Sequence, residues 1–335
     1  MKRGKPVTIK EIAKKLRVSP STVSRALKDH PSIGLVTTMR VKKMAKELNY
    51  EPNQRAIFFK QKKTFTIGVI VPSLLEPFFS EAITAIEEAA NEKSYTVLMG
   101  QSKDDANREL KIIDTFRKHR VDGVLISLGK HTYDTTFIEE LKEYDIPLVF
   151  FDCVPNVEGI PKVYCKLETG IREAVKAFLN RGHQHIALIN GPETLSVSKE
   201  REVAFIRTLK EEGFDFNNQY VVYSDLSEKG NQEAMETLIS MPTRPSAVIS
   251  FNDYVTLDVM KYAREKGVVI NQDIHFISFA NYHFWNYIEN PPMGSIEQYP
   301  GQQGRKATEI LFELIDKEEK RGDRNVSIDS KLILH

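Results

Sequence analysis

Residues 18–27 place short hydroxyl side chains and one long cation close together, in the order Val-Ser-Pro-Ser-Thr-Val-Ser-Arg-Ala-Leu. Ser19 can cap a helix through its hydroxyl, and Pro20 suits the first helical position because it has no N–H to leave unpaired. In this helix Val23 and Leu27 lie four residues apart on one face. The other face is polar and suits hydrogen bonding inside a groove. Its side chains are Ser21, Thr22, Ser24 and Arg25.

Two further helices are predicted around this one. Thr8 and Glu11 have the spacing of a capping box, which opens a helix with Ile9, Ile12, Ala13 and Leu16 on its apolar face. A helix over residues 37–49 brings further apolar side chains to the same small core, and Pro52 ends it. These side chains are Val41, Met44, Ala45 and Leu48. The sequence therefore predicts an all-α helix-turn-helix domain over residues 1–52.

Charge is distributed unevenly along the chain of 335 residues, whose formal net charge is +1. Residues 1–63 hold 17 Lys or Arg against 4 Asp or Glu, a balance of +13, so the remainder carries −12. The basic N-terminal part can bind the phosphates of a nucleic acid, and the acidic remainder cannot. No apolar run approaches membrane-spanning length, and Cys153 and Cys165 have no metal-binding spacing, so we expect a cytoplasmic protein with reduced thiols.

Residues 7–53 resemble the DNA-binding headpiece of the lactose-repressor/galactose-repressor (LacI/GalR) family. The matching residues are Thr8, Ile12, Ala13, Val18, Ser19, Thr22, Val23, Ser24, Arg25, Leu27, Leu48, Asn49, Tyr50, Pro52 and Asn53. The resemblance implies a homodimeric regulator on palindromic operator DNA. Arg25 would read a guanine edge in the major groove, and Ser21 with Pro20 would set sequence preference. The implied DNA-binding residues are Thr8, Ser19, Pro20, Ser21, Thr22, Ser24, Arg25, Asn53, Ala56 and Phe59.

Residues 53–63 form a basic linker with helical potential and two adjacent aromatic residues, Phe58 and Phe59. In the family this segment is a hinge helix that folds on the operator and wedges an apolar side chain into the minor groove. The register set by Asn53 and Ala56 places Phe59 at the wedge, where the family usually has leucine. The alternative interpretation is that both rings pack on the following domain.

From residue 64 onward, short apolar strands alternate with amphipathic helices, which predicts parallel sheets covered on both faces. The strands are expected over residues 66–71, 96–99, 123–127, 147–152, 162–165, 185–190, 220–223, 247–251, 275–279 and 294–298. The helices are expected over residues 79–93, 108–119, 169–180, 201–212, 231–240, 254–266 and 302–317. So many strands predict two doubly wound α/β subdomains.

This pattern resembles the periplasmic-binding-protein-like core that the family uses to bind effectors, in which the chain crosses between subdomains three times. Ligands would bind where both subdomains present the carboxyl ends of their strands to a shared cleft. We expect crossings near Pro161, residues 291–292 and Asn325. Subdomain one would then comprise residues 64–161 and 293–324, and subdomain two residues 162–292 and 325–335.

Aromatic and acidic residues at two predicted strand ends are candidates for ligand contact. Phe78 and Phe79 follow the first strand; one ring is expected to pack inward and the other to stack on a flat ligand face, as the resemblance implies. Asp152 ends a later strand. Its carboxylate could accept hydrogen bonds from sugar hydroxyls or, as an equal alternative, cap the next turn.

Arg201 resembles the arginine of the family's Arg-x-x-Gly-Phe stretch, which reaches the ligand with its forked donors. Ala204 stands in place of that glycine. Asn252 and Asp253 match the family's Asn-Asp pair, with Asn252 expected at the ligand and Asp253 expected to cap the following helix.

Ala280 departs from the family, which usually has an aspartate that binds ligand hydroxyls at this position. Tyr282, Phe284 and Trp285 follow closely. This change fits an apolar, aromatic-stacking or larger ligand, or a degenerate cleft. The candidate effector-binding residues are therefore Phe78, Phe79, Asp152, Arg201, Asn252 and Ala280.

Catalytic motifs are missing from the sequence, which has no phosphate loop, Gly-x-Ser-x-Gly elbow or dinucleotide fingerprint. His183 and His185 are expected to be structural, so no metal, cofactor or enzymatic activity is predicted. The sequence predicts a repressor switched by a small ligand, most simply a sugar, with no membrane partner. The alternatives are a sugar-binding module without a DNA role and a regulator controlled by a protein corepressor.

Overall fold

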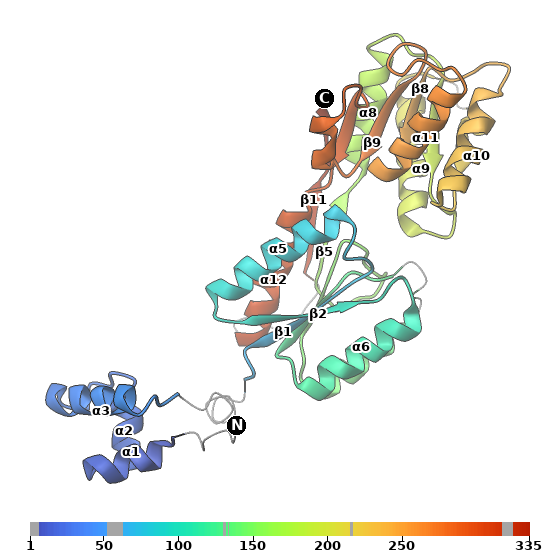
Figure 1. Ribbon diagram of the computed structural model, residues 1–335. Coiled ribbons are helices and arrows are strands. Elements are labelled where there is room, and N and C mark those ends of the chain that lie inside the picture. Colours follow the sequence, from blue (N-terminus) through green and yellow to red (C-terminus); the bar gives the residue numbers. More distant parts are fainter. Residues whose placement is uncertain (1–6, 52–62, 130–131, 133, 215–216, 317–323) are drawn as a thin grey trace. The chain divides into compact units, whose positions relative to one another are not determined.

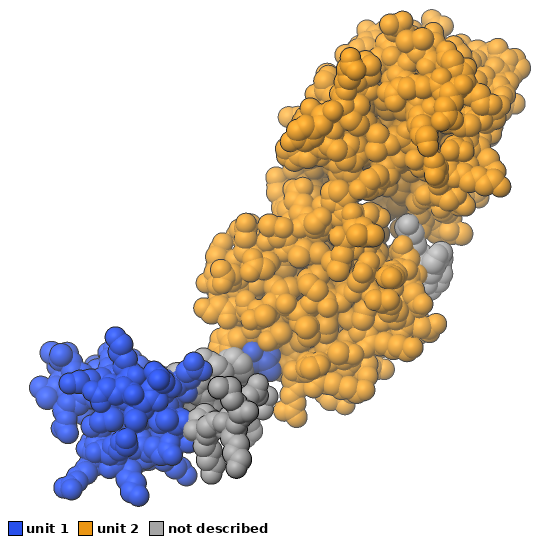
Figure 2. Space-filling model, viewed as in Figure 1, with its two compact units in different colours: residues 1–64 blue, residues 65–335 orange. Residues whose placement is uncertain are grey.

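The computed structural model describes residues 7–51, 63–129, 132, 134–214, 217–316 and 324–335. The chain divides into two compact units, Met1–Thr64 and Phe65–His335 (Figure 2). Among the described residues, none of the helices is both long and apolar enough to span a membrane.

The headpiece is built from three helices: α1 (Ile9–Leu16), α2 (Pro20–Ala26) and α3 (Leu35–Glu47). Thr8 and Glu11 form the predicted capping box, since each side chain bonds the backbone of the other. The buried side chains come from all three helices, and this confirms the predicted core. They are Ile12, Ala13, Val23, Ala26, Val41 and Ala45.

Helix α3 begins two residues before its predicted start. Its cap is Gly34, which offers no side-chain hydrogen bond, and Leu35 and Val36 are 76% and 73% exposed. The apolar spacing that predicted the helix marks only core-facing positions, so it missed this solvent-facing first turn.

The first lobe of the larger unit contains a sheet of six parallel strands in the order β11-β5-β4-β3-β1-β2 (Figure 1). Alternate residues of β1 pack on opposite faces, with Val69 beneath α5 and α12, and Ile70 beside α6. The strands are β1 (Thr66–Val71), β2 (Thr96–Gln101), β3 (Gly123–Ile126), β4 (Leu148–Phe151), β5 (Lys162–Lys166) and β11 (Asn325–Asp329). The helices are α5 (Pro77–Glu92), α6 (Ala106–His119), α7 (Phe137–Glu143) and α12 (Pro300–Asp316).

The second lobe repeats this arrangement in the order β12-β10-β9-β8-β6-β7, with β12 antiparallel to β10. Its strands are β6 (Ile186–Asn190), β7 (Val221–Tyr223), β8 (Ala247–Ser250), β9 (His275–Phe279), β10 (Gly294–Glu297) and β12 (Lys331–Leu334). Its helices are α8 (Glu168–Leu179), α9 (Ser196–Glu211), η1 (Asn218–Tyr220), α10 (Glu228–Ile239), α11 (Asp253–Glu265) and η2 (His283–Tyr287). Two doubly wound lobes confirm the predicted fold class.

The predicted crossing points between the lobes are wrong by one strand each. Strands β5 and β11 pair within the first sheet and β10 within the second, so the chain crosses after these strands rather than before them. Prolines mark two of the three predicted boundaries, but the sheet that a strand joins depends on its non-local partners. The short helix α7 and the edge strand β11, which is partly exposed along its length, were not predicted at all.

Two of the crossing segments are tied together by Ser330, which is 1% exposed. Its hydroxyl donates to the carbonyl oxygen of Lys166 at 2.7 Å and accepts from the Gly170 N–H at 3.0 Å. Two of the segments that link the lobes are therefore joined to each other by hydrogen bonds.

His183 and His275 meet at the amino ends of strands in the second lobe, with ring centroids 4.7 Å apart. Nδ1 of His183 lies 2.8 Å from the hydroxyl of Ser246, which gives this histidine a structural partner. Burial lowers the pKa of both rings, and the charge of Arg181 acts in the same direction. Because each folded-state pKa lies below the unfolded one, the unfolded chain takes up protons first, and stability is lost as pH falls.

We therefore expect the free energy of unfolding to decrease as the pH falls below about 6.5, the ordinary pKa of histidine. Urea denaturation at a series of pH values measures this slope. His275→Gln removes one titrating ring and should make the slope shallower. An unchanged slope in that variant would show that other groups cause the acid sensitivity.

Candidate functional site

The polar face predicted for the recognition helix is present on α2. Ser19 adopts an extended backbone and its hydroxyl accepts the N–H of Thr22 at 3.0 Å, while Pro20 occupies the first helical position. Val23 and Ala26 are fully buried against the headpiece core. The opposite side of the helix is therefore left to solvent, with Pro20, Ser21 and Arg25 exposed and Thr22 and Ser24 half-buried.

A cluster of hydroxyl groups organises the start of this helix. The Ser19 hydroxyl lies 2.7 Å from that of Ser21 and 2.8 Å from that of Thr22. Arg25 lies one helical turn beyond Ser21, and its guanidinium makes no hydrogen bond or ion pair with the described residues. An exposed guanidinium beside ordered hydroxyls can form the bidentate contacts that read a base edge.

The remaining DNA candidates are placed less favourably or lie outside the described part of the chain. The Thr8 N–H donates to the Glu11 carboxylate at 2.7 Å, so a negative charge lies beside the hydroxyl proposed to anchor a phosphate. Asn53, Ala56 and Phe59, with the rest of the predicted hinge, fall among the residues that are not described.

Ser19→Ala should destabilise the headpiece by about 1 kcal/mol, because the Thr22 N–H loses its cap. Ser19→Asp, which can still cap the helix, should retain most of the stability. Hydrogen exchange of the headpiece amides in the full chain measures both variants. Equal protection in the wild type and Ser19→Ala would contradict the capping role.

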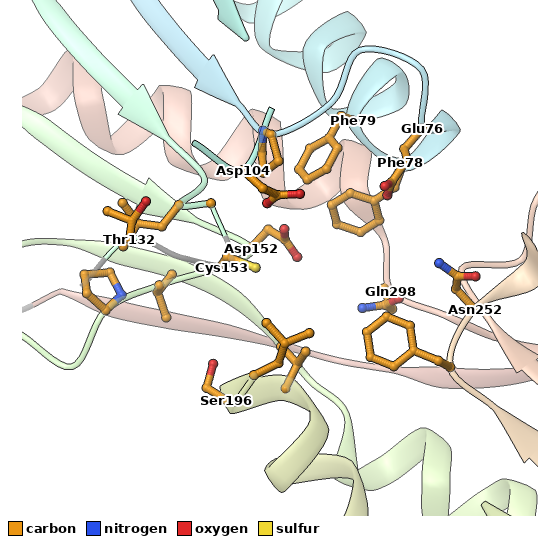
Figure 3. Close-up of a pocket in the computed structure, with 18 of the residues that line it drawn as sticks. Glu76, Phe78, Phe79, Asp104, Thr132, Asp152, Cys153, Ser196, Asn252 and Gln298 are labelled. Carbon is orange, nitrogen blue, oxygen red and sulfur yellow. The ribbon is translucent and has the colours of Figure 1, made fainter. Parts of the chain in front are cut away.

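A cavity of about 400 Å³ lies between the two lobes, at the carboxyl ends of their strands (Figure 3). Residues from the loops after β1, β2, β3 and β4 form one wall, and residues from the second lobe form the other. The first sheet reverses its strand order between β1 and β3 and the second between β6 and β8, which is where open α/β sheets bind ligands. All six predicted effector-binding residues line this cavity.

Phe78 and Phe79 follow Pro77 in the first turn of α5. Their rings meet edge to face with centroids 5.2 Å apart, and both side chains belong to the core of the first lobe. The sequence predicted one ring in the core and one in the cleft. Instead, each ring is largely buried and also contributes to the cavity wall.

Asp152 directly follows β4, with a left-handed backbone at φ 58°. Its carboxylate accepts a hydrogen bond from the Ser127 hydroxyl at 3.0 Å. Burial, and then the negative charge of Glu76, raise the pKa of Asp152 to about 6. This carboxylate is therefore mostly ionised at neutral pH and is stabilised by a cation or a hydrogen-bond donor in the cavity.

Arg201 lies on the first turns of α9 and is only 4% exposed. Its guanidinium carbon is 4.1 Å from the ring centroids of both Phe251 and Phe279. Within the described residues, Nε and Nη1 have no hydrogen-bond partner. Burial lowers the pKa of Arg201 to about 10, opposed by the charges of Glu200 and Asp152. A buried cation whose nitrogens have no acceptor is a candidate for ligand binding.

The roles of Asn252 and Asp253 differ from those predicted. Asn252 is the cap of α11, because its side-chain oxygen accepts the Val255 N–H at 2.9 Å. Asp253 was expected to be the cap but is fully buried. Its carboxylate accepts hydrogen bonds from Ser278, from Ser295 at 2.9 Å and from the Tyr282 N–H at 2.5 Å. Asn252 still borders the cavity, and Asp253 fixes the loop that carries Tyr282.

Ala280 borders the cavity with φ 96°, and Asn281 follows with φ 55°. Both values are unusual for residues with a side chain, and such backbones persist where the surrounding structure holds them. The loop after β9 is anchored by a hydrogen bond of 2.9 Å from the Asn281 amide to Glu297. At this point the cavity wall carries only the methyl side chain of Ala280.

Sequence reasoning missed several residues of the cavity wall. Glu76 precedes α5, Asp104 follows β2, and Gln298 lies where the chain returns to the first lobe. Cys153 also borders the cavity. Each lies at the end of a predicted strand or within five residues of it, which was the available signal, because carboxyl ends of parallel strands converge.

Comparisons with known proteins identify both units. Residues 8–53 match the model of bacterial regulatory proteins of the lacI family, and residues 64–335 match that of periplasmic binding proteins and the sugar binding domain of the LacI family. The chain is 30% identical over 312 residues to the HTH-type transcriptional repressor CytR of Escherichia coli, covering 93% of this chain and 91% of that protein. It is 30% identical over 316 residues to the repressor PurR of Pasteurella multocida, covering 94% of each.

The fold is similar to that of the lac repressor dimer bound to operator and the anti-inducer ONPF. The TM-score is 0.82, with 22% identity and 98% of each chain covered. The headpiece and the two-lobed core thus occur together in a protein of known structure.

Proposed function

This chain belongs to the LacI family of bacterial regulatory proteins, and from that membership we propose that a carbohydrate bound in the cleft switches its affinity for operator DNA. The chain is a DNA-binding transcriptional regulator, as its named relatives are repressors. The identity of the ligand and the residues that contact it are proposals.

The observation that carries the ligand proposal is Arg201 in the cavity between the lobes. A sugar hydroxyl or ring oxygen at its edge would supply the acceptor that the described residues do not provide. Asp152 would accept hydroxyl donors from the opposite lobe. A ligand held by both lobes favours one relative arrangement of them, and this differential affinity is what biases a two-state regulator.

On the DNA side, we propose that α2 enters the major groove, with Arg25 at a guanine and Ser21 and Pro20 setting sequence preference. Thr8, Ser19 and Asn53 would anchor phosphates, and Phe59 would enter the minor groove. The regulator would act in the cytoplasm as a homodimer on a palindromic operator, because a two-fold protein presents two identical helices to two half-sites.

A ligand screen tests the proposal. The full chain is subjected to thermal unfolding with mono-, di- and oligosaccharides, sugar phosphates and purines. A ligand at 100 times its dissociation constant should stabilise it by about 2.7 kcal/mol. Fluorescence anisotropy with operator DNA, selected from random sequence, should then change on addition of that ligand. If no compound in the panel raised the unfolding temperature, the result would contradict a small-molecule effector and favour control by a protein corepressor.

A further inference from the structure

Tyr282 is part of the second lobe but packs into the core of the first. It follows β9, yet its side chain lies in the buried cluster of the first lobe, together with Phe78 and Phe79 of α5. The residue is 6% exposed. Phe284, two residues later, packs against this cluster and also against a buried cluster of the second lobe. The loop after β9 is therefore a place where the two lobes share packing.

The hydroxyl of Tyr282 reaches the amino end of α5 in the first lobe. The cap residue of this helix, Glu76, provides no side-chain hydrogen bond. Pro77 has no N–H, and the N–H of Phe79 donates to the Glu76 carbonyl oxygen at 3.0 Å. The N–H of Phe78 has no acceptor within the helix, because it belongs to the first turn. The Tyr282 hydroxyl lies within hydrogen-bonding reach of this N–H, so a residue of one lobe completes a helix of the other.

Tyr282 is held firmly within its own lobe. The carboxylate of Asp253, which is fully buried, accepts the Tyr282 N–H at 2.5 Å and the hydroxyl of Ser295 at 2.9 Å. The ring of Tyr254 on α11 meets the Tyr282 ring edge to face, with centroids 5.5 Å apart. Because the loop is fixed in this way, a movement of the second lobe carries Tyr282 with it. Separation of the lobes therefore withdraws this side chain from the first-lobe core.

This contact between the lobes lies at the cleft. Tyr282 lines the same cavity as Phe78 and Phe79, whose rings are labelled in Figure 3. A ligand in the cavity therefore meets residues on both sides of the contact. The contact is either formed or broken, because a packed ring has few intermediate positions. A ligand that favours one of these two states shifts the population of lobe arrangements.

We propose that Tyr282 is a positioning residue that sets the balance between two lobe arrangements, because its contact with the amino end of α5 is formed in one arrangement and broken in the other. Breaking the contact exposes an aromatic ring and leaves the start of α5 uncapped, and both changes cost free energy. This inference rests on the proposed two-state switching of the regulator and does not depend on the identity of the effector.

Hydrogen exchange of the full chain tests whether the contact caps α5. Tyr282→Phe keeps the ring and removes the hydroxyl, so exchange at the start of α5, in the other lobe, should become about fivefold faster. Tyr220→Phe is the matched control, because the Tyr220 hydroxyl donates to the carbonyl oxygen of Thr243 within the second lobe. This control should leave exchange at α5 unchanged. Unchanged exchange at α5 in Tyr282→Phe would overturn the inference.

Operator affinity tests whether the contact controls the regulator. Anisotropy with the selected operator duplex and no added ligand should show that Tyr282→Phe changes the dissociation constant by at least about fivefold, and Tyr282→Ala by more. Tyr220→Phe should stay within about twofold of the wild type.

Two results would overturn the inference. A change below about fivefold in Tyr282→Phe, with faster exchange at α5, would show that this residue only caps the helix. An equal change in Tyr220→Phe would assign the effect to lost stability of the second lobe. Neither measurement uses an effector, so failure of the ligand screen and failure of this inference are separate outcomes.

Discussion

Replacing Arg201 by methionine is expected to abolish the response to the effector while leaving the ligand-free chain as stable as the wild type or more stable. Arg201 is 4% exposed, and two of its guanidinium nitrogens have no acceptor in the described part of the protein. Its burial is therefore costly without ligand, as the lowered pKa indicates. With ligand, charge-assisted hydrogen bonds at this edge should contribute about 2 to 3 kcal/mol to binding.

Thermal unfolding with and without the ligand found in the screen measures both effects of Arg201→Met. The ligand-dependent shift should disappear, whereas the unfolding temperature of the free chain should not fall. Lys199→Met, an exposed cation on the same helix, is the control and should retain the full shift. A variant of Arg201 that unfolds early and still responds to ligand would show that this arginine is structural.

Replacing Arg25 by alanine is expected to weaken specific operator binding by about 1 to 3 kcal/mol, with nonspecific binding nearly unchanged. Arg25 is exposed on α2, and the residues that pack this helix into the core, Val23 and Ala26, point the other way. Its loss should therefore remove base contacts without disturbing the fold. The same logic predicts relaxed sequence preference at one base pair of each half-site.

Anisotropy with the selected operator and a scrambled duplex, at one fixed salt concentration, measures the effect of Arg25→Ala. Lys46→Ala removes an exposed cation from α3 and serves as the control, since a lost phosphate contact weakens both duplexes alike. Full operator affinity in Arg25→Ala would refute the assignment. An equal loss on both duplexes would place Arg25 at the phosphate backbone instead.

In the cleft, the groups that can give specificity for a ligand also lower the stability of the ligand-free protein. Asp152 and Arg201 are both held in ionised forms that burial disfavours. The Ser127 hydroxyl donates to Asp152, and two rings cover Arg201, but Nε and Nη1 of Arg201 have no acceptor among the described residues, so its burial is not fully compensated in the free protein. Binding sites commonly retain such groups because a ligand can satisfy them.

Local signals in the sequence were enough to determine the headpiece. Ser19 with Pro20, and Thr8 with Glu11, specify helix starts through contacts within four residues, and the structure places both caps as predicted. The apolar runs of the core likewise predicted ten of its strands at nearly their observed positions, because buried parallel strands are continuously apolar.

Only the tertiary structure decided which strands share a sheet and which polar groups meet in the cleft. Strands β5, β10 and β11 were assigned to the wrong lobes because pairing joins residues far apart in the sequence. The local pattern predicts Asp253 as the cap, because its neighbours in space, Ser278 and Ser295, are far from it in the sequence. Arg201 was found from its sequence context, but its contacts with the rings of Phe251 and Phe279 were not. Burial and charge at a site come from elements that only the folded chain brings together.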